Sequence, residues 1–245
     1  KDPVENLQFR RYLWARVKRE KGERWKQIVR EINYVCKQDI KFYINAACWL
    51  HEPRNLDKGR LPHLPFVTWP YQDFAIDQMV DCIRTGKELV IEKSRDMGAS
   101  WMCLTVFEWF WHFHDGLKFL LLSRNKEAVD DKLDSDSLFW KIDEIHRRLP
   151  GWLSPKTIRR DMSIYNEDTA SMITGGTTVA AAGVGGRATA MLVDEFSRFL
   201  ASTAVEIYSG TRDTARCRIF NFTPMGTSHP SYELLAKRPS IEEDP

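Results

Sequence analysis

The residues with the clearest potential for chemistry form the stretch KSRDMGAS, residues 93–100, between an expected strand and an expected helix. In the phosphate-binding pattern G-x-x-x-x-G-K-S/T, Gly98 fills the second glycine position and Ser100 fills the hydroxyl position. Backbone N–H groups of such a loop bind phosphate oxygens, and the hydroxyl binds Mg²⁺. The predicted contacts to nucleotide and metal are Lys93, Ser94, Arg95, Asp96, Met97, Gly98, Ala99 and Ser100.

The loop departs from the pattern in the position of its cation. Lys93 stands in the first glycine position, and Ala99 stands where the pattern has lysine. Because bound phosphates still need a positive charge, we expect Lys93 to make the main contact and Arg95 to act second. Without nucleotide, Arg95 is expected to pair with a carboxylate such as Asp96 or Glu195. Taken alone, the stretch is better interpreted as a polar loop between a strand and a helix.

A second stretch, MLVDE at residues 191–195, changes that interpretation. It is an apolar strand that ends in two acids, and it follows the loop by about a hundred residues. In this arrangement Asp194 would hold Mg²⁺ through water, and Glu195 would polarise the attacking water. An acid pair at a strand end, at this distance from a phosphate loop, is a better signal than either feature alone.

A third stretch, FNFTPMG at residues 220–226, is expected to be a strand that ends at Thr223, because Pro224 cannot continue it. Thr223 could therefore sense the terminal phosphate or its attacking water. Considered alone, Thr223 is only the end of a strand.

The elements that must position these residues alternate along the chain. Helices are expected over most of residues 1–50, over 71–83 and 99–114, and over roughly 125–148. Strands are expected at 88–92, 117–123, 190–193 and 218–223, with a hairpin over 171–182 around Gly175 and Gly176. Residues 53–70 contain four prolines and are expected to be an extended connector. This alternation predicts an α/β fold with a mostly parallel central sheet flanked by helices.

Composition limits the functional classes. The chain has 245 residues and a formal net charge of +2, so any affinity for nucleic acid would have to be local. The apolar run at residues 99–113 is interrupted by Glu108 and is too short to span a bilayer. The five cysteines are scattered without a CxxC pair, which argues against a disulfide framework or zinc site and favours a reducing cytosol.

A basic stretch lies near the amino terminus. Its cations are Arg10, Arg11, Arg16, Lys18, Arg19, Lys21, Arg24, Lys26 and Arg30, against Glu20 and Glu23. A solvated helix face is the favoured interpretation, and a contact with DNA or another acidic partner is the alternative. Trp25, Ile28, Val29, Ile32 and Cys36 form an apolar stripe at helical spacing in the same region.

Other polar or aromatic clusters favour ordinary structural roles. His112 and His114 are two residues apart on an expected helix, so they point to different faces and make a poor metal pair. The aromatic residues expected in the core are Trp101, Phe107, Trp109, Phe110, Trp111 and Phe113. The acids expected on a solvated helix face or helix start are Asp130, Asp131, Asp134 and Asp136.

Four motifs in order carry a family resemblance: YQ at residues 71–72, KSRDMGAS, MLVDE and FTPMG. Together they resemble the ATPase domain of the large terminase subunits of tailed bacteriophages over roughly residues 40–235, and residues 42–54 resemble the segment upstream of the family's Q motif. The resemblance implies a P-loop NTPase core of the RecA-like, ASCE type with an N-terminal helical subdomain. It also implies ATP and Mg²⁺ as ligands and a motor that drives double-stranded DNA into a preformed capsid.

The resemblance also implies roles for single residues. Tyr71 and Gln72 match the Q motif that reads adenine, and Arg95 matches a common loop arginine. Lys93 matches the phosphate contact and Ser100 the Mg²⁺ contact. Asp194 matches the Mg²⁺ ligand, Glu195 the catalytic carboxylate and Thr223 the coupling motif. Arg187, after Gly185 and Gly186, resembles a catalytic arginine finger directed toward a neighbour's nucleotide. Its gap to Asp194 is shorter than expected, and a loop arginine on a glycine bend is an equal interpretation.

The expected domains are an N-terminal helical or lid segment at residues 1–60 and a P-loop ATPase core at residues 61–245. The residues after Thr223 are too few for the family's nuclease domain, so we expect an ATPase fragment without nuclease activity. Implied partners are double-stranded DNA, the portal protein, the small terminase subunit and further copies in a ring on the capsid, although a fragment could be monomeric. No membrane contact is expected, and the implied location is the cytoplasm of an infected bacterial host.

Two alternatives remain open. Because Ala99 replaces the usual lysine, the domain could be a nucleotide-gated module that binds DNA or the portal without appreciable turnover. Glu195 favours the enzyme, since a module that only binds would not need it. The second alternative is another P-loop DNA translocase or a helicase, although the sequence contains no second motor domain.

Overall fold

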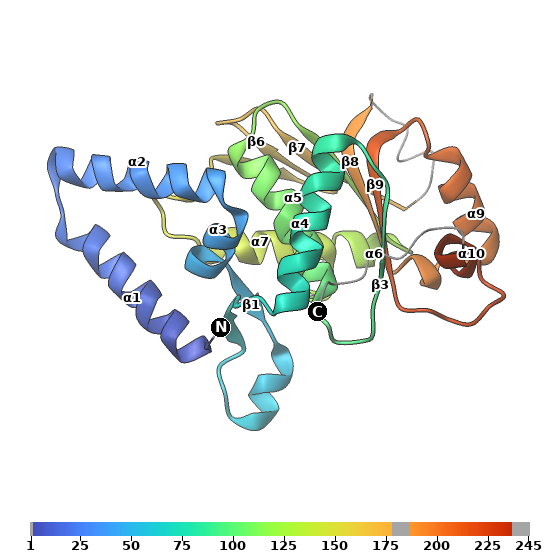
Figure 1. Cartoon of the computed structure of the whole chain (residues 1–245), viewed down its shortest axis with the longest axis horizontal. Helices are drawn as coiled ribbons and strands as arrows, with labels where there is room; N and C mark the ends of the chain where they lie inside the picture. The colour runs from blue at the N-terminus through green and yellow to red at the C-terminus, as the bar shows by residue number, and fades with distance from the viewer. Residues whose placement is uncertain (1, 178–186, 237–245) are drawn as a thin grey trace.

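Three helices open the chain, α1 (Pro3–Arg19), α2 (Gly22–Gln38) and α3 (Ile40–Ala47), in a computed structural model that describes residues 2–177 and 187–236 (Figure 1). The side chains of Asp2 and Asp39 accept backbone N–H bonds and cap α1 and α3. The predicted apolar stripe of α2 is confirmed, because Ile28, Ile32 and Cys36 are buried and the other two residues pack against the same core.

The next elements lead into the central sheet. Strands β1 (Trp49–His51) and β2 (His63–Pro65) pair antiparallel, with the 3₁₀ helix η1 (Pro53–Lys58) between them. The chain continues through α4 (Pro70–Thr85), β3 (Leu89–Glu92), α5 (Ala99–Phe113), β4 (Lys118–Leu122), α6 (Lys126–Val129), α7 (Leu138–Arg148), β5 (Thr157–Arg160), β6 (Ser163–Asn166) and β7 (Met172–Gly176). The last described elements are β8 (Ala188–Asp194), the 3₁₀ helix η2 (Phe196–Arg198), α9 (Ala201–Gly210), β9 (Ala215–Phe222) and α10 (Pro230–Ala236).

The central sheet has the strand order β3-β9-β8-β4-β7-β6-β5. The pairs β3·β9, β9·β8, β8·β4 and β4·β7 are parallel, and β7·β6 and β6·β5 are antiparallel. The predicted α/β fold with a mostly parallel sheet is confirmed. Because the carboxyl ends of parallel strands meet at one edge, the segments that follow β3, β4, β8 and β9 lie together.

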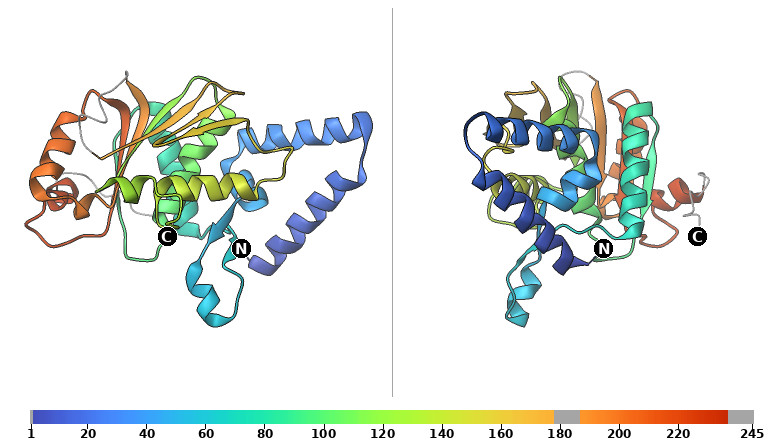
Figure 2. Two further views of the ribbon diagram at one scale, coloured as in Figure 1. Left: turned by 180° about the vertical axis from the view of Figure 1, so that it is seen from behind. Right: turned by 60° about the vertical axis from the view of Figure 1, so that its left-hand side comes forward.

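Helices cover both faces of the sheet (Figure 2). Side chains alternate along each strand, so Phe119 and Leu121 of β4 pack with α4, α5 and α7, whereas Leu120 and Leu122 pack with η2, α9 and α10. Helix α5 lies deepest, with thirteen of its fifteen residues buried. The aromatic residues of α5 therefore belong to the core, as predicted.

The helix predicted over residues 125–148 is wrong. The structure has the short α6, an irregular segment at residues 130–137, and then α7. Short polar side chains cause the break, because they accept nearby backbone N–H bonds that a continuous helix would need. Asp131 accepts from Leu133 N at 2.8 Å. Asp134 makes the same kind of turn with Asp136 N at 2.9 Å.

The hairpin predicted around Gly175 and Gly176 is also misplaced. Both glycines lie inside β7, which pairs with β4 and β6, and the turn between β6 and β7 falls at residues 167–171. A Cβ atom on Gly175 would approach Val129 Cγ1 to 2.5 Å, so close packing explains this glycine. Residues 178–182 of the predicted hairpin lie outside the described residues.

Residues 53–70 are less extended than predicted, since they include η1 and β2. The division of the chain at residue 60 stays a prediction, because helices before and after it contribute to one hydrophobic core.

All five cysteines are free and buried. Within residues 2–177 and 187–236, no helix combines the length and apolar character that a bilayer crossing requires.

A buried polar cluster joins the amino-terminal helices to the core. Glu108 of α5, which is fully buried, accepts hydrogen bonds from Tyr43 of α3 at 2.9 Å, while its other oxygen contacts His112 Nδ1 at 3.0 Å and His146 Nε2 of α7 at 3.1 Å. Burial alone would raise the pKa of Glu108, but the two histidines outweigh it and lower the pKa to about 2. His112 therefore has a structural role in this cluster.

Replacing Glu108 by alanine is expected to lower the free energy of unfolding by about 3–5 kcal/mol, because three buried polar groups lose their shared partner. Glu108→Gln should lower the free energy of unfolding by a smaller amount. Since the folded pKa lies below the ordinary 4.5, the stabilisation is present above that pH and is lost as the pH falls toward 2. Urea unfolding of both variants across this range measures the effect, and an alanine variant as stable as wild type at neutral pH would contradict it.

Candidate functional site

A cleft of about 940 Å³ opens at the carboxyl edge of the parallel strands. Its lining includes the loop between β3 and α5, the start of α4, residues 50–54, the β4–α6 connection, the α6–α7 segment and α7. Asp194, Glu195 and Thr223 also line the cleft. Pockets that hold small molecules commonly have volumes of about 300–1,000 Å³, so the cleft has the size of a ligand site.

The loop at residues 93–100 turns sharply into α5 at Gly98, whose φ is +69°. A Cβ on Gly98 would lie 3.1 Å from Gln72 Nε2, so both backbone conformation and space favour glycine here. Ala99 is 5% exposed and belongs to the hydrophobic core. Ala99 also lines the cleft, and because alanine carries no charge, the cation for bound phosphates must come from another residue.

Tyr71 and Gln72 lie against this loop at the start of α4. Gln72 Nε2 donates to the carbonyl oxygen of Met97 at 3.0 Å, and Gln72 Oε1 accepts from Trp69 N at 3.0 Å. Tyr71 is 37% exposed, with its hydroxyl 3.5 Å from the same carbonyl of Met97. The pair thus supports the loop and lines the cleft, while recognition of adenine by these residues stays a prediction.

Lys93 connects two predicted catalytic residues. Its Nζ donates to Glu195 Oε1 at 3.0 Å and to Thr223 Oγ1 at 3.2 Å, so residues that follow β3, β8 and β9 meet at one point. Glu195 has a φ of +51°, which turns the chain away from the line of β8 directly after Asp194. The structure therefore brings together a cation, a carboxylate and a hydroxyl that lie far apart in the sequence.

Asp194 lies beside this group and is 4% exposed. Its carboxylate accepts from Ser100 Oγ at 2.9 Å and from Asn221 Nδ2 at 2.6 Å. Burial raises the pKa of Asp194, and these two hydrogen bonds act in the opposite direction. A buried carboxylate beside a hydroxyl is an oxygen pair of the kind that Mg²⁺ binds together with substrate phosphates, so the residues fit this metal.

The predicted pairing of Arg95 with Asp96 or Glu195 is wrong. Asp96 instead lies 3.1 Å from Arg54 Nη1, and Glu195 pairs with Lys93. Arg95 is exposed and lines the cleft with Lys93 and residues 96–100, whereas the exposed Ser94 is not part of the lining. Arg198 of η2 is a further cation near Glu195, at 4.0 Å from its Oε2.

Arg187 lies at the opposite edge of the sheet from the cleft. It is exposed and directly precedes β8, whose seven residues end at Asp194. At a rise of about 3.3 Å per residue, the strand places Arg187 roughly 20 Å from Asp194. A role toward the nucleotide of a neighbouring copy stays a prediction. The glycines that precede Arg187 lie outside the described residues.

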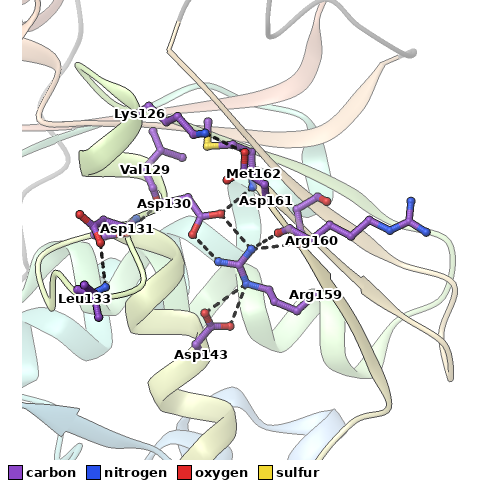
Figure 3. Close-up of polar contacts among 12 residues, drawn as sticks. Lys126, Val129, Asp130, Asp131, Leu133, Asp143, Arg159, Arg160, Asp161 and Met162 are labelled. Atoms are coloured by element: carbon purple, nitrogen blue, oxygen red, sulfur yellow. Dashed lines mark hydrogen bonds and ion pairs between the residues drawn. The ribbon is translucent and has the colours of Figure 1, made fainter.

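A network of ion pairs fixes the segment between α6 and α7, part of which lines the cleft (Figure 3). Arg159 of β5 donates from Nη1 to Asp130 Oδ2 at 3.0 Å and from Nε to Asp143 Oδ1 at 3.1 Å. Asp130 Oδ2 also accepts from Met162 N at 2.6 Å. The prediction of a solvated face is therefore wrong for Asp130, whose side chain is 2% exposed. The network fixes the α6–α7 segment to the β5–β6 hairpin.

Sequence reasoning missed two polar residues of the site. Asn221 lies in β9 and donates a hydrogen bond to Asp194. The sequence feature that could have indicated it is a polar residue within an otherwise apolar strand. Lys141 of α7 lines the cleft and is 7% exposed. Nothing in its local sequence marks it, because its place depends on how α7 packs.

Among the described residues, no three His, Cys, Asp or Glu side chains are arranged to hold a metal.

The fold and the loop before α5 define the class of the protein as an α/β protein with a P-loop-type fold. Its fold resembles the ATPase domain of the Thermus phage P74-26 large terminase, with a TM-score of 0.50, 14% sequence identity, and coverage of 73% of this chain and 74% of that chain. The HK97 bacteriophage large terminase is also similar, with a TM-score of 0.49, 9% identity, and coverage of 68% of this chain and 35% of that chain. Neither a protein-family model nor a curated protein matches the sequence.

Proposed function

We propose that the chain is the ATPase motor domain of a viral terminase large subunit, which hydrolyses ATP to move double-stranded DNA into a procapsid. The observation that carries the proposal is the meeting of Lys93, Glu195 and Thr223 beside the Ser100–Asp194 pair. A terminase-like fold supports the same conclusion. The proposal rests on the chemistry of the cleft, because similarity at 14% identity establishes the fold alone.

The residues divide the work of hydrolysis. Lys93 would neutralise the phosphates, and Glu195 would orient water and accept its proton as the water oxygen attacks the γ-phosphorus. The bond from that phosphorus to the bridging oxygen breaks, which leaves ADP and inorganic phosphate. Mg²⁺, held by Ser100 and Asp194, would supply charge stabilisation to the phosphates. Thr223 would contact the terminal phosphate, so that β9, which directly precedes Thr223, responds to the presence or loss of that phosphate.

The proposed partners follow from this motor function. They are double-stranded DNA, a portal protein, a small terminase subunit and further copies of the chain in a ring. The proposed location is the cytoplasm of an infected bacterial host. A full-length parent would also carry endonuclease activity, whereas none is proposed for these residues.

A basic tip on the amino-terminal helices supports DNA as a partner. Residues 11–30 contain eight Lys and Arg and two Glu, although the whole chain has a net charge of only +2. The connection between α1 and α2 is an apex far from the sheet (Figures 1 and 2). Lys18, Arg19, Lys21 and Arg24 are exposed there. A projecting cluster of this charge suits the phosphate backbone of a duplex.

Phosphate release by the purified chain, measured with and without duplex DNA, tests the proposed function. A motor domain should release phosphate from Mg·ATP, with a rate that DNA changes. Binding of Mg·ATP without release would favour the nucleotide-gated module instead. Release that needs single-stranded nucleic acid would favour a helicase.

Replacing Lys18, Arg19 and Lys21 together by serine is expected to weaken DNA binding without changing basal ATP hydrolysis. Each lost phosphate contact should reduce the slope of log K against log salt by about 1, so a loss of up to about 3 is expected. Filter binding at several salt concentrations measures this slope. Lys58, Lys118 and Lys156 are exposed elsewhere and provide a matched triple control. Equal effects of the two triple variants would contradict a DNA site at the tip.

A further inference from the structure

Lys141 is a buried cation in the wall of the cleft. It lies one turn into α7, is 7% exposed, and lines the same cleft as Lys93 and Asp194. Its Nζ donates a hydrogen bond to the carbonyl oxygen of Asp136, on the segment that leads into α7. The wall that carries Lys141 therefore presents a positive charge to the cleft from outside the phosphate loop.

The charge of Lys141 is incompletely compensated. An ammonium group has three N–H donors, and within residues 2–177 and 187–236 its one hydrogen-bond partner is the Asp136 carbonyl, with no carboxylate in an ion pair. Burial lowers the pKa of Lys141, while the carboxylates of Asp136, Asp194 and Asp134 raise it from longer range. A buried charge is costly unless an anion approaches it, so this site is suited to an anionic ligand.

The surrounding structure holds Lys141 in place. Ser137, at the start of α7, accepts from Asp131 N at 2.9 Å and donates to the Val129 carbonyl at 3.1 Å. The Arg159 network holds the same segment at its start, through Asp130, and after its end, through Asp143 on α7 (Figure 3). The ammonium is thus positioned before any ligand arrives, which reduces the entropic cost of binding.

We infer that Lys141 is a second phosphate-binding cation, which contacts a terminal phosphate oxygen of the bound nucleoside triphosphate. This inference rests on the proposed function. It also explains how the cleft tolerates Ala99, because Lys93 and Lys141 would approach the phosphates from two walls and share the role of the usual loop lysine. Since the contact is to the terminal phosphate, Lys141 should distinguish a triphosphate from a diphosphate.

Calorimetric titration of Lys141→Met with Mg·ATP and with Mg·ADP tests the inference. Methionine has similar length and no charge, so the fold should tolerate it. Loss of a hydrogen bond to a charged group is expected to weaken Mg·ATP binding by roughly 10- to 100-fold, and Mg·ADP binding by less than about threefold. Lys141→Arg retains the charge and should recover part of the preference for ATP. Lys126→Met is the control, because Lys126 pairs with Asp161 on the surface.

The outcomes separate this inference from the proposed function. If Lys141→Met lowers the melting temperature but keeps the wild-type ratio of ATP to ADP affinity, Lys141 only supports the segment at residues 130–137, and the inference is overturned. If Lys141→Met does not fold, Lys141→Gln takes its place, because it removes the charge but keeps an N–H donor for the Asp136 carbonyl, and a wild-type ratio in Lys141→Gln overturns the inference. If wild type itself binds no Mg·ATP, the proposed function fails, and the inference fails with it.

Discussion

Glu195→Gln is expected to lower the rate of ATP hydrolysis by roughly 10²- to 10⁴-fold while Mg·ATP still binds. The amide keeps the shape of the side chain but cannot accept a proton from water. The Ser100–Asp194 pair is left intact, so the proposed Mg²⁺ site remains. The substitution also releases Lys93 from its ion pair at 3.0 Å, so the affinity for ATP should stay constant or rise.

Phosphate release at saturating ATP and calorimetric titration of Mg·ATP measure the two effects separately. Glu206→Gln is a matched control, because Glu206 is exposed on α9. Turnover of Glu195→Gln close to that of wild type would show that Glu195 is not the catalytic carboxylate. Equal losses in both variants would point to a general effect of charge.

Lys93→Ala is expected to weaken Mg·ATP binding and nearly to stop hydrolysis. Lys93 is 11% exposed and already lies between Glu195 and Thr223, where the terminal phosphate is proposed to bind. A compact ammonium on a flexible stem can exchange those partners for phosphate oxygens. Removing it also leaves Glu195 with only the more distant Arg198, at 4.0 Å, as a nearby cation, so repulsion between Glu195 and the phosphates adds to the loss.

Arg95→Ala is the comparison, and it should affect binding less, because Arg95 is exposed. Titration calorimetry and phosphate release on both variants measure the difference. Unimpaired turnover in Lys93→Ala, or a larger loss in Arg95→Ala, would contradict the assignment of Lys93 as the main phosphate cation.

The sequence predicts the parts of this site that depend on local pattern. The strand expected at 88–92 and the helix expected at 99–114 form as β3 and α5, with the predicted loop between them. Asp194 and Thr223 follow buried strands, and the parallel topology brings such strand ends to one edge. Motif order and strand alternation therefore predict that Lys93, Asp194 and Thr223 lie at one edge of the sheet.

The parts that depend on tertiary packing could not be predicted in this way. Lys141 has no distinctive neighbours, and it becomes part of the cleft only because the chain breaks between α6 and α7. That break depends on competition between helical hydrogen bonds and the turns of Asp131 and Asp134. The Arg159 network joins residues up to thirty-two positions apart, and no local pattern indicates it.

The most direct test of the central claim is a structure of the chain bound to Mg²⁺ and a non-hydrolysable ATP analogue. The account predicts that the triphosphate lies over residues 93–100, with Mg²⁺ beside Ser100 and Asp194 and the ammonium of Lys93 on the phosphates. A nucleotide bound outside this cleft, or bound within it with the Lys93 ammonium directed away from the phosphates, would contradict the account.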